Sequence, residues 1–160
     1  MVDKIIAKEI IVGSTEGQHV RLAPDGIRLQ RSLINPLAWL TVEHDHPNLY
    51  FFDAHAKERV RLLIENDGTP QLMFLDANGA PRLMCLLETD GTPVIELYNA
   101  LGQTRLTYRL DPDDNTPVIQ WFDKNEKKCF EMGLDRQDEM SFQTLNEKGY
   151  WEDWTPRKRE

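Results

Sequence analysis

The chain has 160 residues, with 27 acidic against 19 basic side chains and a formal net charge of −8. This length predicts one ordinary domain over residues 1–160, and the acidic balance argues against nucleic acid or anionic lipid as a partner. Residues 1–20 lack the pattern of a signal peptide, and no stretch approaches the roughly 18 apolar residues of a membrane span. We therefore expect a cytoplasmic protein without membrane contact, or alternatively a virion component.

The N-terminal segment, residues 1–23, precedes the patterned part of the chain. Its residues 5–13, "IIAKEIIVG", predict a β-strand, and residues 32–42, "SLINPLAWLTV", form a second apolar passage. Either stretch is a candidate cover for an apolar sheet face further along. The two cysteines, Cys85 and Cys129, show no metal or disulfide spacing, so we expect free thiols in strands.

Residues 24–146 repeat with a period of about 23 residues. Five prolines mark the period at intervals of 23, 23, 23 and 24, namely Pro24, Pro47, Pro70, Pro93 and Pro117. The next slot holds Met140, so six units can be counted, the last of them degenerate. Arg59, Arg82 and Arg105 occupy the same position in successive 23-residue units.

Each unit reads turn, strand, turn, strand, as in "DGTPQLMFLDANGAPRLMCLLE" at residues 67–88. Asp-Gly suits a two-residue hairpin connection, because glycine accepts a positive φ without a Cβ clash. Asn115 replaces Gly68 and Gly91 in that slot, and asparagine is the next best residue there. "DANG" supplies the second turn. The sequence thus predicts an all-β fold of tandem antiparallel β-hairpins.

One apolar face is rebuilt in the second strand of successive units by alternate residues: Val60, Leu62, Ile64, Leu83, Cys85, Leu87, Leu106, Tyr108, Leu110, Phe130, Met132 and Leu134. The opposite face is apolar over residues 50–87 and becomes polar later in the chain. A sheet that is apolar on both sides needs a cover in water. We expect another layer of this chain, or another copy of it, over residues 50–87.

The stretch at residues 74–105, "FLDANGAPRLMCLLETDGTPVIELYNALGQTR", resembles a tandem pattern of bacterial and phage-encoded repeat proteins. That pattern is aromatic-Asp-Ala-Asn-Gly-x-x-Arg, followed by an alternating strand and Asp-Gly-[Ser/Thr]-Pro. "LYNALGQTRLTY" is also similar to the YD-repeat, and MORN repeats share the 23-residue hairpin period but carry more glycines. The resemblance implies a hairpin-repeat fold and no particular function.

Two places have metal-ligand residue types. His44 and His46 form a His-x-His pair, although the repeat places them in a turn slot. Asp111 and Asp113 mimic the start of an EF-hand calcium loop, which requires glycine at its sixth position, where this chain has Thr116. We therefore expect no metal or cofactor.

No arrangement of residues predicts catalysis. The serines lie in no nucleophile elbow, neither cysteine is near a histidine in a known motif, and a glycine-rich phosphate loop is absent. The carboxylates mostly occupy turn slots, so nothing singles out a catalytic pair. We expect no enzymatic activity.

Residues 147–160 form a tail with three aromatic residues outside the repeat, Tyr150, Trp151 and Trp154. They predict a cap over the open end of the array or, less directly, a site for partner docking. Trp39 and Trp121 fall in strands, where core packing is expected. Aromatic rings also permit a carbohydrate or small-ligand binding module as the alternative function.

Three architectures fit these observations. Several chains could pack their apolar faces around a shared axis as an elongated prism or fibre, with three copies as the simplest closure. One chain could instead close into a barrel or a two-layer sandwich, or remain an open sheet. We favour the first, because short strands make a deep ligand barrel awkward and an open sheet exposes much apolar surface. The expected function is a structural or protein-interaction module, a spacer or adaptor that forms a homo-oligomer.

Overall fold

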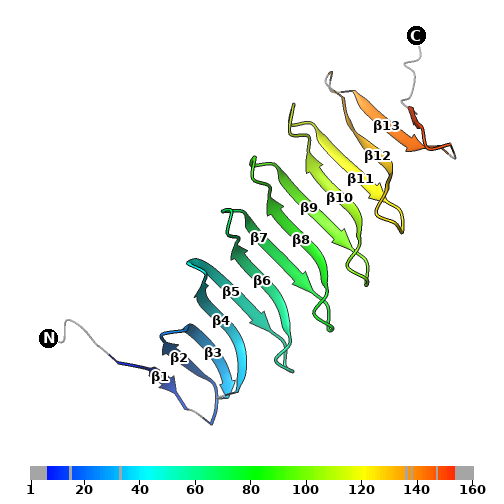
Figure 1. Cartoon of the computed structure of the whole chain (residues 1–160). Coiled ribbons are helices and arrows are strands. Elements are labelled where there is room, and N and C mark those ends of the chain that lie inside the picture. Colours follow the sequence, from blue (N-terminus) through cyan, green and yellow to red (C-terminus); the bar gives the residue numbers. More distant parts are fainter. Residues whose placement is uncertain are drawn as a thin grey trace. The chain divides into compact units, whose positions relative to one another are not determined.

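The computed structural model describes residues 7–14, 16–32, 34–135, 137, 139–146 and 148–153 (Figure 1). These residues form fourteen strands and no helix. The strands are β1 (Ile10–Gly13), β2 (His19–Ala23), β3 (Gly26–Ser32), β4 (Asn35–Glu43), β5 (His46–Phe52), β6 (Glu58–Ile64), β7 (Pro70–Leu75), β8 (Pro81–Leu87), β9 (Pro93–Tyr98), β10 (Thr104–Leu110), β11 (Pro117–Phe122), β12 (Lys128–Leu134), β13 (Met140–Leu145) and β14 (Trp151–Asp153). The prediction of an all-β fold of tandem antiparallel hairpins is confirmed.

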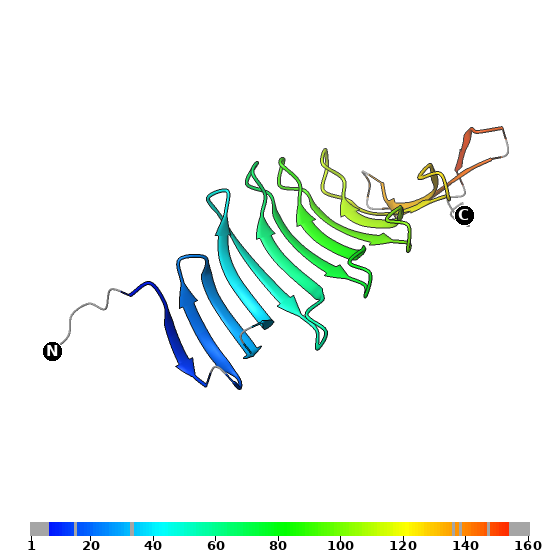
Figure 2. The same cartoon turned by 60° about the horizontal axis from the view of Figure 1, so that its bottom comes forward.

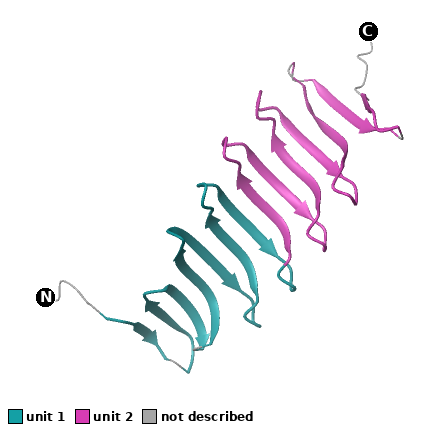
Figure 3. Ribbon diagram, in the orientation of Figure 1, with its two compact units in different colours: residues 1–79 teal, residues 80–160 magenta. Residues whose placement is uncertain are grey.

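The contacts group the chain into two compact units, residues 1–79 with β1–β7 and residues 80–160 with β8–β14 (Figure 3). Hairpins of the same repeat recur in both units. The expectation of one domain over residues 1–160, divided at residues 24 and 147, stays a prediction.

Unit 1 is an open meander in which each strand pairs antiparallel with the next (Figure 2). Unit 2 is a second such meander. Within each unit the described strands contact only their neighbours in sequence, so each meander is a single layer. The alternative of a closed barrel or a two-layer sandwich is therefore wrong for these units, because no strand returns to pair with or cover an earlier one.

The apolar N-terminal passages were expected as covers, and this expectation is wrong for their described residues. Ile10–Gly13 forms β1 and pairs edge to edge with β2, while β4 continues the same meander between β3 and β5. Their main-chain groups are satisfied by neighbouring strands rather than by lying across a sheet. The faces of the meander thus receive no cover from these residues.

The Asp-Gly turns differ from the two-residue connection predicted for them. In the Asp67 turn the Gly68 N–H donates to the Glu65 carbonyl (2.9 Å) and the Glu65 N–H to the Thr69 carbonyl (2.9 Å). Gly68 has φ +89°, so this is a three-residue loop that ends in a left-handed glycine. The prediction failed because it treated Asp and Gly as both central residues, whereas the turn begins one residue earlier.

Two turns depart from this pattern in instructive ways. His44 and Asp45 have φ values of 51° and 68° and form a true two-residue connection between β4 and β5. In the next-to-last turn of this class the Asp111 N–H donates to the Thr116 carbonyl (2.8 Å), one residue further than in the Glu88–Thr92 turn. That added residue accounts for the single interval of 24 in the proline spacing.

The other class of turn begins at an Asp or Asn whose side-chain oxygen accepts two backbone N–H groups of the turn. Asp53 Oδ1 accepts the N–H groups of His55 (2.8 Å) and Lys57 (3.1 Å), and Asp123 Oδ1 accepts the equivalent pair. These backbone hydrogen bonds hold the pKa of both carboxyls below its usual range. Asn99 and Asn146 make the same two contacts, which explains why Asp and Asn interchange here.

Candidate interaction surface

One face of unit 1 is apolar on every strand. The cross-strand register aligns one row of residues across all seven strands, which are Ile10, Leu22, Ile27, Leu40, Leu49, Leu62 and Leu72. A second row is Val12, Val20, Leu29, Ala38, Phe51, Val60 and Phe74. Residues paired across strands lie on the same face of the sheet. The two rows share that face because side chains alternate along each strand and the rows are two residues apart. We call these two rows the apolar face of unit 1.

Unit 2 has an equivalent surface. One row runs from β8 to β13 through Cys85, Ile95, Tyr108, Ile119, Met132 and Phe142, and the other through Leu83, Leu97, Leu106, Trp121, Phe130 and Thr144. We call these rows the apolar face of unit 2. Trp121 packs edge-to-face on Phe130, with ring centroids 4.8 Å apart. The alternation predicted from the sequence is thus confirmed on both units.

The apolar faces are not buried. Large exposed side chains on the face of unit 1 include Val12, Ile27, Leu29, Leu40, Phe51, Leu62 and Phe74, and those on the face of unit 2 include Ile95, Leu97 and Tyr108. No described side chain is completely removed from solvent. A soluble domain normally buries such residues in a core, so each unit exposes the surface that would otherwise form one.

The opposite face of unit 1 is the better covered one, although it is more polar. Tyr50 is 8% exposed and donates its hydroxyl to Glu43 (3.0 Å), while Arg61 lies 5.2 Å from the Tyr50 ring. Arg28 covers the Trp39 ring at 4.2 Å. Burial and the Glu43 contact raise the pKa of Tyr50 to about 12. Long side chains that reach over aromatic rings of the neighbouring strand therefore cover this face without a second layer.

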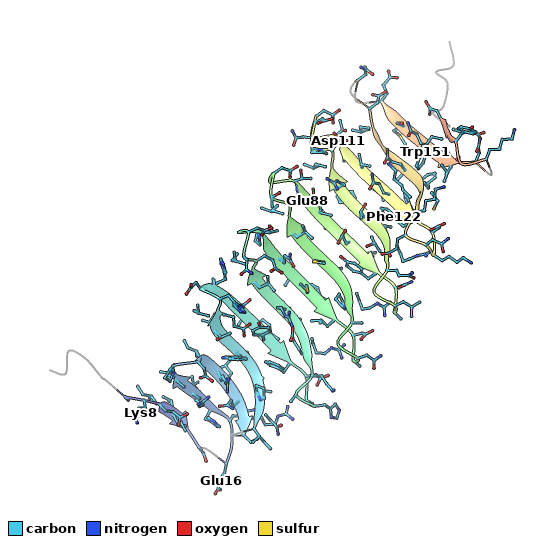
Figure 4. All side chains as sticks on the ribbon, in the orientation of Figure 1. Lys8, Glu16, Glu88, Asp111, Phe122 and Trp151 are labelled. Carbon is cyan, nitrogen blue, oxygen red and sulfur yellow. The ribbon has the colours of Figure 1, made fainter. Side chains whose placement is uncertain are left out.

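The opposite face of unit 2 carries hydrogen-bonded and ionic contacts. Thr107 donates to Gln120 (3.1 Å), Gln120 donates to Glu131 (2.7 Å), and Lys128 pairs with Glu131 (2.6 Å). Arg109 pairs with Glu88 at 2.9 Å. Glu88 and Asp111 lie at turns on one side of the unit, where strands end, and Phe122 lies toward the turns on the other side (Figure 4). The charges of this face are thus already engaged within the chain.

The residues with metal-ligand potential line two separate hollows. His44 and His46 border a hollow of about 170 Å³ with Glu43 and Tyr50. Asp111 and Asp113 border one of about 250 Å³. Within the described ranges, no cluster of three or more His, Cys, Asp or Glu side chains is arranged to hold a metal ion.

The three aromatic residues of the tail are only partly described. Tyr150 is 69% exposed, and Trp151 is 41% exposed on the edge strand β14, with Lys128 Nζ 5.0 Å from its ring centre. Trp154 lies outside the described residues. The role of this group as a cap or a docking site stays a prediction.

The sequence predicted the apolar alternation, and it indicated that a sheet apolar on both faces over residues 50–87 needs a cover. For the face opposite the apolar rows, that expectation counted apolar residues alone, whereas burial also depends on long polar neighbours such as Arg61. The apolar character of both rows on all seven strands of unit 1 is the signal that could have located the exposed surface.

The described part of the chain contains no helix long and apolar enough to cross a bilayer. No protein-family model matches the sequence, and no curated protein matches it either. The geometry of the chain itself therefore carries the functional argument.

Proposed function

We propose that this chain is a structural or protein-interaction module, a spacer or adaptor without catalytic activity that associates with copies of itself. The supporting observation is that each unit is a single layer of hairpins whose strands contact only sequence neighbours. A single layer buries its main-chain groups but leaves one side chain face open, so it gains stability by association.

The described side chains serve the fold rather than a reaction. The turn aspartates bind backbone N–H groups, and the arginine, glutamate and glutamine side chains pair across strands. Trp39 is covered by Arg28 and Trp121 packs on Phe130, so these rings support a carbohydrate platform less well than a packing role. Cys85 and Cys129 are free thiols, which suits a reducing compartment such as the cytoplasm.

The absolute molar mass in solution tests this proposal. Light scattering behind a sizing column, at two concentrations about a hundredfold apart, should give a stable multiple of 18.6 kDa. We expect three copies, because three is the simplest closed arrangement of inward-facing sheets around one axis. A compact monomer at both concentrations would contradict the proposal and would favour a ligand-binding module instead.

A further inference from the structure

We infer that copies of this chain meet through their apolar faces, so that each copy covers the apolar rows of another while the opposite faces stay in solvent. This inference rests on the proposed self-association and identifies its surface and its occupant. The apolar face of unit 1 is central to it, because both of its rows are apolar on all seven strands.

The exposed area matches that of a stable homotypic contact. The large exposed side chains on the apolar face of unit 1 present on the order of 700 Å² to solvent, and those on the apolar face of unit 2, taken separately, present about 300 Å². Monomeric proteins seldom expose a continuous apolar patch of more than a few hundred Å². A standard interface buries about 800 Å² on each partner. The exposed side chains on the apolar face of unit 1 therefore present nearly the area that one partner contributes to a stable contact.

The chemistry of the face favours a second copy over other occupants. The rows contain no charged residue, so an acidic or basic peptide would find no complementary charge there. The apolar faces of other copies need no complementary charge, and β-sheets bury apolar side chains by packing such faces against one another. An anionic lipid surface is disfavoured by the net charge of −8.

The opposite face is the wrong candidate for the same contact. It carries the Arg61–Glu58 pair at 2.7 Å and the Arg109–Glu88 pair at 2.9 Å, each partly exposed to solvent. Removing such pairs from water is costly unless the partner supplies new hydrogen bonds. Association through the apolar face leaves these ion pairs in solvent.

Two variants of equal charge separate the two faces. Leu62→Lys places a cation on the apolar face, and Gln71→Lys places one on the opposite face of the adjoining strand β7. Leu62 is 46% exposed, so the lysine can extend into water in a single copy. We expect Leu62→Lys to weaken association at least about a hundredfold, whereas Gln71→Lys keeps the mass of the native protein.

A second measurement uses the native face and does not depend on the folding of a strongly perturbed variant. Cys85 belongs to the apolar face of unit 2, whereas Cys129 lies at the bulge of β12, where its thiol contacts the Trp121 carbonyl. In Cys129→Ser protein, a thiol reagent should label Cys85 at least about tenfold more slowly in the oligomer than after dilution below both light-scattering concentrations, to a concentration at which the protein is monomeric. In Cys85→Ser protein, the rate at which the same reagent labels Cys129 at the same concentrations serves as the matched control.

The outcomes separate this inference from the proposed function. A native oligomer that Leu62→Lys leaves intact, with Cys85 labelled as fast as in the monomer, would overturn the apolar contact but leave self-association standing. A native monomer would overturn both. Co-flotation of that monomer with phosphatidylcholine vesicles would identify a lipid surface as the occupant instead.

Discussion

Arg82 donates from Nε to the carbonyl oxygen of Tyr98 at 3.0 Å, sixteen residues further along the chain. Arg59 makes the same contact with the Leu75 carbonyl at 3.1 Å, also sixteen residues ahead. Two of the three arginines that superpose in the sequence thus tie the start of one strand to the end of the following one. This contact explains why an arginine recurs at a position that faces no core.

Arg82→Ala should therefore lower the free energy of unfolding by about 1 kcal/mol, because the Tyr98 carbonyl exchanges a charged donor for water. Urea denaturation at one fixed protein concentration measures this loss. Arg31→Ala, which truncates an exposed arginine of β3, is the matched control and should stay near the native value. Equal stability of the two variants would show that the contact with Tyr98 has no role.

Gly91→Val should cost about 1–3 kcal/mol through backbone strain alone. Gly91 has φ +88°, and a Cβ there would meet no atom within 4 Å, so no clash contributes. Gly91→Asn should cost clearly less, because Asn115 adopts φ 61° in a turn of the same class. Thermal unfolding of both variants provides the comparison, and similar losses would contradict the assignment of a left-handed turn.

Acidification should destabilise the protein through its turn carboxylates. Asp53, Asp67, Asp90 and Asp123 all have a lowered pKa, chiefly because each accepts hydrogen bonds from its own turn. A lowered folded pKa gives stability that is complete above the unfolded value of about 3.9 and is lost as the pH falls through the folded value. Urea unfolding at neutral pH and at about pH 3 should show the loss.

The double variant Asp53→Asn with Asp123→Asn should lose less stability on acidification than the native protein. Asparagine keeps the Oδ1 acceptor, as Asn99 and Asn146 show in the same turn, but it does not titrate. An acid-induced loss as large as the native one would mean that other groups dominate the response.

Tyr50 should ionise near pH 12, since burial and the Glu43 contact raise its pKa to about 12. A raised folded pKa gives stability that is complete below the unfolded value of about 10 and is lost as the pH rises through the folded value. The difference in phenolate absorbance between native protein and Tyr50→Phe should therefore develop near pH 12. Half-titration near pH 10 would contradict the burial of this hydroxyl.

The hairpin order was predictable because it depends on local chemistry. Gly68 and Gly91 mark turns through their positive φ, and Pro70, Pro93 and Pro117 begin strands. The single interval of 24 was visible in the sequence, but its cause was not, since the longer loop at Asp111–Thr116 depends on which N–H the Thr116 carbonyl accepts.

The candidate surface was only half predictable. Alternation indicated which residues share a face, because the period of two is a property of any strand. It could not indicate that Arg28 and Arg61 lie over Trp39 and Tyr50 and cover the opposite face. Cation–π contacts of this kind depend on the cross-strand register, which a single sequence does not specify.

The restriction of strand contacts to sequence neighbours has a kinetic consequence. Every strand pair within a unit closes a short loop. Little chain entropy is therefore lost before the hydrogen bonds and side-chain contacts of that pair form. All-β proteins usually fold slowly because distant strands must find one another. We expect this chain to form hairpin by hairpin as it leaves the ribosome, since a newly made strand needs only the strand synthesised just before it.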